Sequence, residues 1–221
     1  MTKPVVIFGF GDLAQMAHHY FSTDSAHTVA AFTLDRAYIT ETSFCGLPVV
    51  PFDEVEDRYP AVNHTMFVAL GYSKVNQLRK EKYLAAKAKG YELVSYVSSR
   101  ATVLNQGEIG ENCFILEDNT IQPFVTVGDN VVMWSGNHIG HHSTVHDHCF
   151  LASHIVVSGG VDLGECCFVG VNATFRDHIR IGESCVIGAG ALMLADTEPF
   201  GVYVGAATER SRVPSNRLRR I

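Results

Sequence analysis

The sequence predicts two regions, a small N-terminal α/β region and a C-terminal left-handed parallel β-helix. Two observations predict the β-helix: a large apolar residue recurs at every sixth position, and a glycine directly follows many of these residues. A third observation predicts the α/β region, because a short apolar strand, a glycine-rich turn and a helix-like run follow one another at its start. We expect the α/β region, a Rossmann-like half domain, to span residues 1–97, the β-helix residues 98–199 and a C-terminal tail residues 200–221.

The six-residue period runs without interruption over most of the C-terminal half. The apolar positions are Val103, Ile109, Ile115, Ile121, Val127, Met133, Ile139, Val145, Leu151, Val157, Leu163, Val169, Phe175, Ile181, Ile187 and Met193. No α-helix or ordinary strand has a period of six, whereas a triangular coil built from three six-residue faces has it. We expect these side chains to point inward, with a small or β-branched residue four positions later at each bend. Successive coils should stack, so that each residue lies directly over the residue one full coil, or three six-residue faces, later in the chain.

Four cysteines follow the same geometry. Cys113, Cys149, Cys167 and Cys185 each lie four positions after an inward residue, at separations of whole coils. Stacked coils keep their Cβ atoms parallel, which excludes disulfides between them. A column also does not converge on one point, as zinc ligands must. We therefore interpret these residues as small core residues, and we expect no metal site.

The first apolar strand is expected at Val5–Phe8, before a Gly-x-Gly-x-x-Ala turn and a helix-like run to Phe21. Backbone amides at such a strand-to-helix junction can bind a phosphate, although a tight turn without a ligand is the alternative. Candidate substrate-binding residues are therefore Gly9 and Gly11, together with Asp35 at the end of a second strand, where nucleotide folds carry a ribose-binding acid. Further elements are expected at Val29–Leu34 (strand), Met66–Leu70 (strand), Val75–Lys89 (helix) and Glu92–Val97 (strand). This unit is too short to hold a whole dinucleotide.

Histidines are concentrated in the β-helix. His142, His148 and His154 recur at the six-residue step, so they lie on different faces and cannot share a metal ion. His141 lies two positions after the inward Ile139 and is expected at the surface, where an imidazole can act as a general base. Gly159 occupies the equivalent place one coil later, and its N–H could hold an acyl carbonyl oxygen. A polar surface histidine is the alternative for His141 and the preferred interpretation of His146, His148, His154 and His178.

Composition and charge exclude several classes of protein. The net charge is −6, and basic residues are scattered except in the last dozen positions, so no basic stripe predicts nucleic-acid binding. No apolar run reaches the roughly 20 residues of a membrane helix. The N-terminus lacks a signal-peptide cleavage pattern, so we expect a cytoplasmic protein.

Together, these features resemble the hexapeptide-repeat nucleotide-sugar N-acetyltransferases, which include bacterial UDP- and GDP-amino-sugar acetyltransferases and are similar to sialic acid O-acetyltransferases. The resemblance covers nearly the whole chain and is most specific at residues 137–149 and 166–172. It implies a nucleotide at Gly9, Gly11 and Asp35, and a homotrimer that binds acetyl-CoA between neighbouring β-helices. It also implies that His141 is the catalytic base. The acyl-CoA contacts that it implies are Gly159, Ala189 and Gly190.

Three departures from the family pattern stand out. Relatives often carry an acid beside the base histidine, whereas this chain has Gly140 and His142 there; Asp147 could supply the orienting role, or His142 could share the base function. The first glycine turn has Asp12-Leu13-Ala14 where many relatives have Gly-His-Gly. The closing motif reads Gly205-Ala206-Ala207-Thr208 in place of Gly-x-Pro-Ala.

The resulting expectation is an acetyl-CoA-dependent N-acetyltransferase that acts on a nucleotide-linked amino-deoxy sugar in surface polysaccharide or glycan biosynthesis. His141 and His142 are the candidate catalytic residues. Two alternatives stay open at this stage. One is a sugar O-acetyltransferase, and the other is a catalytically silent trimeric β-helix that serves as a scaffold or binding protein.

Overall fold

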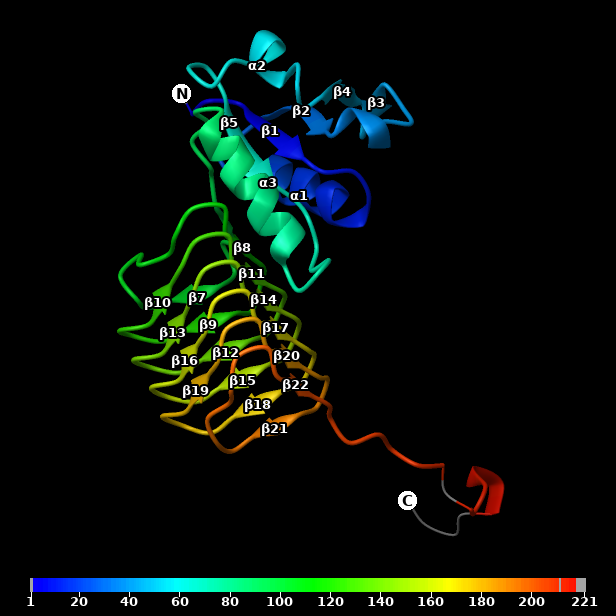
Figure 1. Ribbon diagram of the computed structural model, residues 1–221, viewed down its shortest axis with the longest axis vertical. Coiled ribbons are helices and arrows are strands. Elements are labelled where there is room, and N and C mark those ends of the chain that lie inside the picture. The colour runs from blue at the N-terminus through cyan, green and yellow to red at the C-terminus, as the bar shows by residue number, and fades with distance from the viewer. Residues whose placement is uncertain (1, 211, 218–221) are drawn as a thin grey trace.

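The computed structural model describes residues 2–210 and 212–217, and it contains both predicted regions (Figure 1). The elements of the α/β region are β1 (Val5–Phe8), α1 (Asp12–Thr23), β2 (Val29–Leu34), a 3-10 turn (Arg36–Tyr38), β3 (Ser43–Phe44), β4 (Leu47–Pro51), α2 (Val55–Arg58), β5 (Thr65–Val68) and α3 (Gln77–Ala88). They form a five-stranded sheet in the order β3-β4-β2-β1-β5. All pairs are parallel except β3 and β4, which form an antiparallel hairpin.

The sheet of the α/β region is covered on both faces. Every residue of β1 is buried, as expected for a central parallel strand with two covered faces. Helix α1 packs on one face through Ala14, Ala17 and Phe21, and helix α3 packs on the other through Tyr83 and Ala86. Because β2 and β5 lie on opposite sides of β1, the strand order reverses there, which is where open α/β sheets bind ligands.

The predicted elements of this region agree with the structure in all but one case. Only Tyr96–Val97 (β6) of the strand predicted over Glu92–Val97 is a strand, and it pairs with the β-helix rather than with the α/β sheet. Leu93 makes an isolated bridge to Met66. The elements β3, β4 and α2 are not predicted from the sequence, because elements of two to five residues give little periodic signal.

The β-helix consists of two-residue strands, and from Val103 to Met193 each strand ends at a residue of the six-residue period. After β6, the strands are β7 (Thr102–Val103), β8 (Phe114–Ile115), β9 (Thr120–Ile121), β10 (Thr126–Val127), β11 (Val132–Met133), β12 (His138–Ile139), β13 (Thr144–Val145), β14 (Phe150–Leu151), β15 (Val156–Val157), β16 (Asp162–Leu163), β17 (Phe168–Val169), β18 (Thr174–Phe175), β19 (Arg180–Ile181), β20 (Val186–Ile187), β21 (Leu192–Met193) and β22 (Val202–Tyr203). A 3-10 turn (Ser215–Arg217) follows.

These strands form three parallel sheets, one for each face of the left-handed coil (Figure 1). Their orders are β10-β13-β16-β19, β21-β18-β15-β12-β9-β7 and β22-β20-β17-β14-β11-β8-β6. Paired residues such as Ile139 and Val157 are separated by three six-residue steps, so the predicted coil length is confirmed. Strand β22 belongs to the last sheet although its residues fall in the range expected to be tail.

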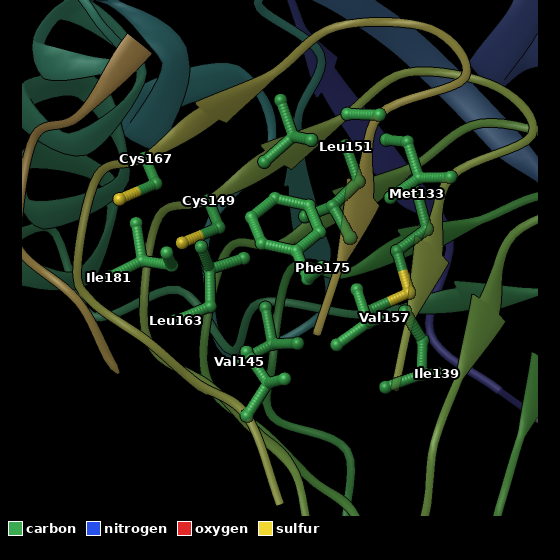
Figure 2. Packing of buried hydrophobic residues seen from close by; sticks show 14 of the residues in the cluster. Met133, Ile139, Val145, Cys149, Leu151, Val157, Leu163, Cys167, Phe175 and Ile181 are labelled. Atoms are coloured by element: carbon green, nitrogen blue, oxygen red, sulfur yellow. The ribbon is translucent and has the colours of Figure 1, made fainter. Parts of the chain in front are cut away.

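The interior of the β-helix is a continuous apolar core (Figure 2). The residues of the six-residue period are buried from Ile115 to Met193, while Val103 and Ile109 at the first coil are half-buried and pack against the core. Most residues four positions later, such as Val125 and Ala173, are also buried, whereas Thr197 after the last coil is half-buried. Each six-residue face therefore contributes two inward side chains, as the sequence pattern predicts.

The cysteine column lies inside this core. Figure 2 shows Cys149 and Cys167 on neighbouring coils with parallel side chains. Their thiols donate to the carbonyl oxygens of Gly164 and Gly182, each at 3.1 Å. All six cysteines are free thiols, which agrees with the sequence interpretation of the column as core residues.

A second six-residue period marks the corners of the β-helix. Residues in the left-handed region of backbone conformation, with φ between +54° and +65°, occur at Asn112, Asp118, Phe124, Asn130, His142, His148, His154, Cys166, Asn172, His178 and Ser184. Glycines take the same place at 136, 160 and 190. Asparagine, aspartate, histidine and glycine adopt this conformation most readily, which explains why histidines recur at this spacing.

Arg79 and Asn76 join the two regions. The Arg79 side chain is fully buried, and its Nη2 atom donates to three carbonyl oxygens of the β-helix: Asn130 (3.2 Å), His148 (2.7 Å) and Cys149 (3.0 Å). Burial lowers the pKa of Arg79 to about 10, which still leaves the guanidinium charged at neutral pH. The Asn76 side chain donates to the carbonyl oxygens of Cys166 and Cys167 on the next coil.

Helix α3 corrects one prediction. His148 was expected to be a surface histidine, but it is buried because α3 covers its corner. Its Nδ1 lies 2.9 Å from the Asn130 side-chain amide, and its ring contacts the Tyr83 ring at 5.3 Å. Desolvation by burial is the main cause that lowers the pKa of His148. His148 is therefore part of the joint between the regions.

No helix in the described part of the chain is long and apolar enough to cross a membrane.

Candidate functional site

A cavity of about 610 Å³ opens at the carboxyl ends of β1, β2 and β5, and we call it the strand-end pocket. Its lining residues are Phe8, Gly9, Phe10, Leu34, Asp35, Tyr38, Leu70, Leu78, Glu81 and Lys82. Gly9 has a φ of +146°, and a Cβ atom there would lie 2.6 Å from the Ala69 carbonyl oxygen. Only glycine therefore fits at this turn, between β1 and the loop after β5.

The structure places two of the three predicted substrate-binding residues on this pocket. Gly9 and Asp35 line it, whereas Gly11 is the N-cap of α1 and does not. Asp35 accepts a charged hydrogen bond from Lys82 at 2.8 Å. Burial lowers the pKa of Lys82, but the Asp35 and Glu81 carboxylates outweigh this effect and raise it overall.

Two aromatic rings lie at the mouth of the strand-end pocket. Tyr38 is 70% exposed, and Phe10 is held against Phe44 at a ring distance of 4.4 Å. An exposed aromatic face offers a stacking surface to a planar base. The pocket thus combines a close backbone approach, a carboxylate and aromatic surfaces, which suits a nucleotide.

The second part of the candidate site is a corner of the β-helix that follows β12 and β15. His141 follows β12, and its ring lies directly against Gly159, one coil later. A Cβ atom on Gly159 would lie 2.6 Å from His141 Cε1 and 2.8 Å from Nε2. The His141 backbone N–H donates to Gln122 at 2.8 Å, and no described residue accepts a hydrogen bond from the Gly159 N–H. The coil length read from the sequence thus correctly predicted that His141 and Gly159 are neighbours.

His142 contacts His141 through the ring nitrogens. The two Nδ1 atoms are 3.0 Å apart, and the His142 ring packs on Phe124 at a centroid distance of 4.7 Å. Asp147, the residue expected to be able to orient His141, instead accepts a hydrogen bond from the Asp129 N–H at 2.7 Å. His142, expected only to be able to share the base function, is the one in contact with His141.

Ala189 and Gly190 lie at a different corner. They follow β20, and the Gly190 N–H donates to Val171 at 2.8 Å in the preceding coil. Gly159 follows β15 and lies beside His141, at another corner. Within one chain, the three predicted acyl-CoA contacts are therefore not brought together.

Ala189 lines a further cavity of about 400 Å³, the aromatic groove, which sequence reasoning missed. The groove is also lined by Tyr72, Trp134, Phe150, Ala152, Ser153, Phe168, Gly170 and Val171. Tyr72, from the loop after β5, packs on Phe150 and Phe168 at ring distances of 5.0 and 4.7 Å. Phe150 and Phe168 occupy equivalent positions on the outer side of successive coils. This repeat of phenylalanine was the signal in the sequence that could have revealed the groove.

The histidines do not form a metal centre in the described part of the chain. His142, His148 and His154 lie at three separate corners, as predicted, and no group of three His, Cys, Asp or Glu residues in 2–210 or 212–217 is placed to hold a metal ion.

The chain is similar to several known proteins. A profile of the bacterial transferase hexapeptide family (six repeats) matches residues 107–141. The structure matches perosamine N-acetyltransferase from Caulobacter crescentus, solved as a histidine-to-asparagine mutant with CoA and GDP-perosamine. The TM-score is 0.83 at 26% identity, and the match covers 91% of this chain and 93% of that one. Comparison with curated proteins gives no match.

Two further structures share the fold. WeeI from Acinetobacter baumannii matches with a TM-score of 0.77 at 18% identity, covering 92% of this chain and 97% of that one. The acetyltransferase domain of PglB from Neisseria gonorrhoeae matches with a TM-score of 0.63 at 21% identity, covering 91% and 96%. The fold class and the resemblance to hexapeptide-repeat sugar acetyltransferases are thereby confirmed.

Proposed function

We propose that this chain is an acetyl-CoA-dependent N-acetyltransferase that acts on a nucleotide-linked amino-deoxy sugar in surface polysaccharide or glycan biosynthesis. The observation that carries the proposal is the exposed His141 imidazole set against Gly159, whose N–H has no hydrogen-bond acceptor among the described residues. The similarity to perosamine N-acetyltransferase, which binds CoA and GDP-perosamine, extends over most of both chains and supports the choice of substrates.

The strand-end pocket is proposed to bind the nucleotide. Asp35 would accept hydrogen bonds from ribose hydroxyls, and Gly9 allows the ligand to approach the backbone. The Tyr38 and Phe10 rings would contact the base. The acidic Asp12 in the first turn of α1 opposes a phosphate at the helix N-terminus, so we assign the binding energy to the base and ribose rather than to the phosphates.

His141 is proposed to act as the general base. Its Nε2 would accept a proton from the sugar amine while the amine nitrogen attacks the thioester carbonyl carbon of acetyl-CoA. The Gly159 N–H would stabilise the negative charge that develops on the carbonyl oxygen. The C–S bond then breaks, and the His141 imidazolium returns the proton to the CoA thiolate. The products are the acetamido sugar and free CoA.

A homotrimer would complete the site. Gly159 and Ala189 lie at different corners of one chain, so a shared acyl-CoA site needs the Ala189 corner of a neighbouring copy. The aromatic groove beside Ala189 is apolar, which suits the pantetheine arm and acyl group of the thioester. Exposed apolar side chains on the outside of the β-helix, such as Val156 and Leu192, also favour a partner surface.

We place the reaction in the cytoplasm. Six free cysteines, four of them stacked in the core, suit a reducing compartment.

The test measures release of free thiol from acetyl-CoA with a panel of UDP-, GDP- and dTDP-linked amino sugars. Release with one sugar nucleotide, and loss of about 10²–10⁴-fold in kcat for His141→Asn, are expected for a general base. Near-full activity of His141→Asn would remove this residue from the base role. Thiol release only with hydroxyl acceptors would identify an O-acetyltransferase, and absence of acetyl-CoA binding would indicate a scaffold.

Asp35→Asn is the matched variant for the strand-end pocket. It should raise KM for the sugar nucleotide about tenfold, which corresponds to one lost hydrogen bond to a charged group, with kcat nearly unchanged. His141→Asn should instead lower kcat and leave KM for the sugar nucleotide nearly unchanged. If both variants changed the same parameter, the assignment of separate binding and catalytic parts would be wrong.

A further inference from the structure

We infer that His142 positions His141 by accepting a hydrogen bond, and that it thereby selects the tautomer of His141 that can act as a base. The inference rests on the proposed function of His141. It assigns to His142 the orienting role of a carboxylate, but without a negative charge. His142 is then a positioning residue and not a second base.

The distance between the two rings limits where the protons can be. The Nδ1 atoms of His141 and His142 are 3.0 Å apart, so one N–H must lie between them and the other nitrogen must accept it. A neutral imidazole carries a single N–H. If His141 Nε2 is to take a proton from substrate, the proton of His141 must be on Nδ1. His142 Nδ1 is then the acceptor, and His142 carries its own proton on Nε2.

The backbone and Phe124 hold His142 in this place. His142 has a φ of +58°, and Phe124, which lies one coil earlier at the same corner, has a φ of +65°. A phenylalanine in the left-handed region is an uncommon and strained choice. Its side chain is 65% exposed, so burial does not offset that cost within one chain. What Phe124 does contact is the His142 ring, at a centroid distance of 4.7 Å.

The surroundings make this pair different from a histidine oriented by an acid. The rings that the structure places against His142 are His141 and Phe124, and no described carboxylate forms an ion pair with either histidine. Asp147 is occupied by the Asp129 N–H. The orientation of His141 therefore depends on His142 staying neutral, because a protonated His142 would present an N–H to the N–H of His141.

The test compares two substitutions of His142 with a control at another corner. His142→Asn keeps an acceptor close to the position of Nδ1 and tolerates the left-handed backbone. His142→Ala removes the acceptor. Asp118→Ala is the matched control, because Asp118 has a φ of +59° and lies at a corner that does not touch His141. All three variants and the wild-type protein are measured as full-length chains.

We expect His142→Ala to lower kcat about 10–100-fold with both KM values unchanged, which is the range found when a partner that orients a metal-ligating histidine is removed. His142→Asn should recover most of that loss, and Asp118→Ala should match the wild type. An unchanged kcat in His142→Ala, or an equal loss in His142→Asn, would overturn the inference.

A measurement without substrate separates this inference from the proposed function. Ring ¹⁵N NMR should show His141 protonated on Nδ1 and His142 on Nε2 in the wild type, with the His141 proton moving toward Nε2 in His142→Ala. If His141 carried its proton on Nε2 in the wild type, the inference would fail whatever the enzyme does. If the tautomers are as expected and no acceptor is acetylated, the proposed function fails alone.

Discussion

The β-helix and the α/β region bury their side chains in different ways. In the β-helix, each six-residue face sends two side chains into one shared core, and positions one coil apart are direct neighbours. In the α/β region, apolar residues are divided between two faces of a sheet, and one of these layers continues onto the outer surface of the β-helix through Phe114 and Phe150. The periodic region therefore positions His141 and Gly159 by chain distance alone. The irregular region builds the strand-end pocket from segments with no fixed spacing.

The largest expected effect concerns the joint between the two regions. Arg79→Met should lower the free energy of unfolding by about 3 kcal/mol or more, because the buried carbonyl oxygens that accept from the guanidinium lose their donor. The α/β region should then unfold before the β-helix. Chemical denaturation followed by circular dichroism and by Trp134 fluorescence would separate the two transitions.

The exposed Arg58 supplies the control for this experiment. Its side chain is 59% exposed, and its ion-pair partner within residues 2–210 and 212–217 is Glu54, so Arg58→Met should change stability by a few tenths of a kcal/mol. If Arg79→Met unfolded at the midpoint of the wild type, the two regions would not depend on this joint.

The next effect tests the periodic region. Gly159→Ala should lower kcat about 100-fold, because the added methyl group would displace the His141 ring from its place against the backbone. The methyl group points away from the core, so the thermal midpoint should stay close to that of the wild type. Calorimetric titration with CoA would show whether binding is kept. Full activity in this variant would mean that catalysis does not require the His141 ring to lie against the backbone of Gly159.

The smallest effect concerns a second link between the regions. Asp24, at the end of α1, accepts hydrogen bonds from Ser99 and Tyr96, and these hold its pKa at about 2. The pKa in the folded state is thus below the unfolded value of about 3.9. The stabilisation is complete above pH 4 and is lost as the pH falls toward 2.

Asp24→Asn should remove this part of the acid sensitivity. Its thermal midpoint should be somewhat lower than that of the wild type at pH 7, and the two should converge near pH 2. Parallel curves over the whole range would show that Asp24 is not stabilised in the folded state.

The spatial arrangement of the candidate site residues could be predicted from the sequence only where it depends on the period of the β-helix. The contact between His141 and Gly159 follows from the stacking of successive coils, and the distribution of His142, His148 and His154 over three corners follows from the six-residue step. The same reasoning failed for His148, because its burial depends on α3, which approaches from outside the repeat. It also missed the aromatic groove, which needs Tyr72 from the other region.

The sequence by itself determined the β-helix, its inward residues and the longer strands and helices of the α/β region, since these depend on local periodicity and on short-range turn chemistry. Tertiary structure alone decided which polar groups meet. Arg79 reaches carbonyl oxygens of the β-helix that are distant in the chain, Asp35 pairs with Lys82, and His142 rather than Asp147 contacts His141. The first two contacts join atoms of separate segments, and the third depends on the ring orientations of two adjacent residues, so none of them leaves a repeated signal along the chain.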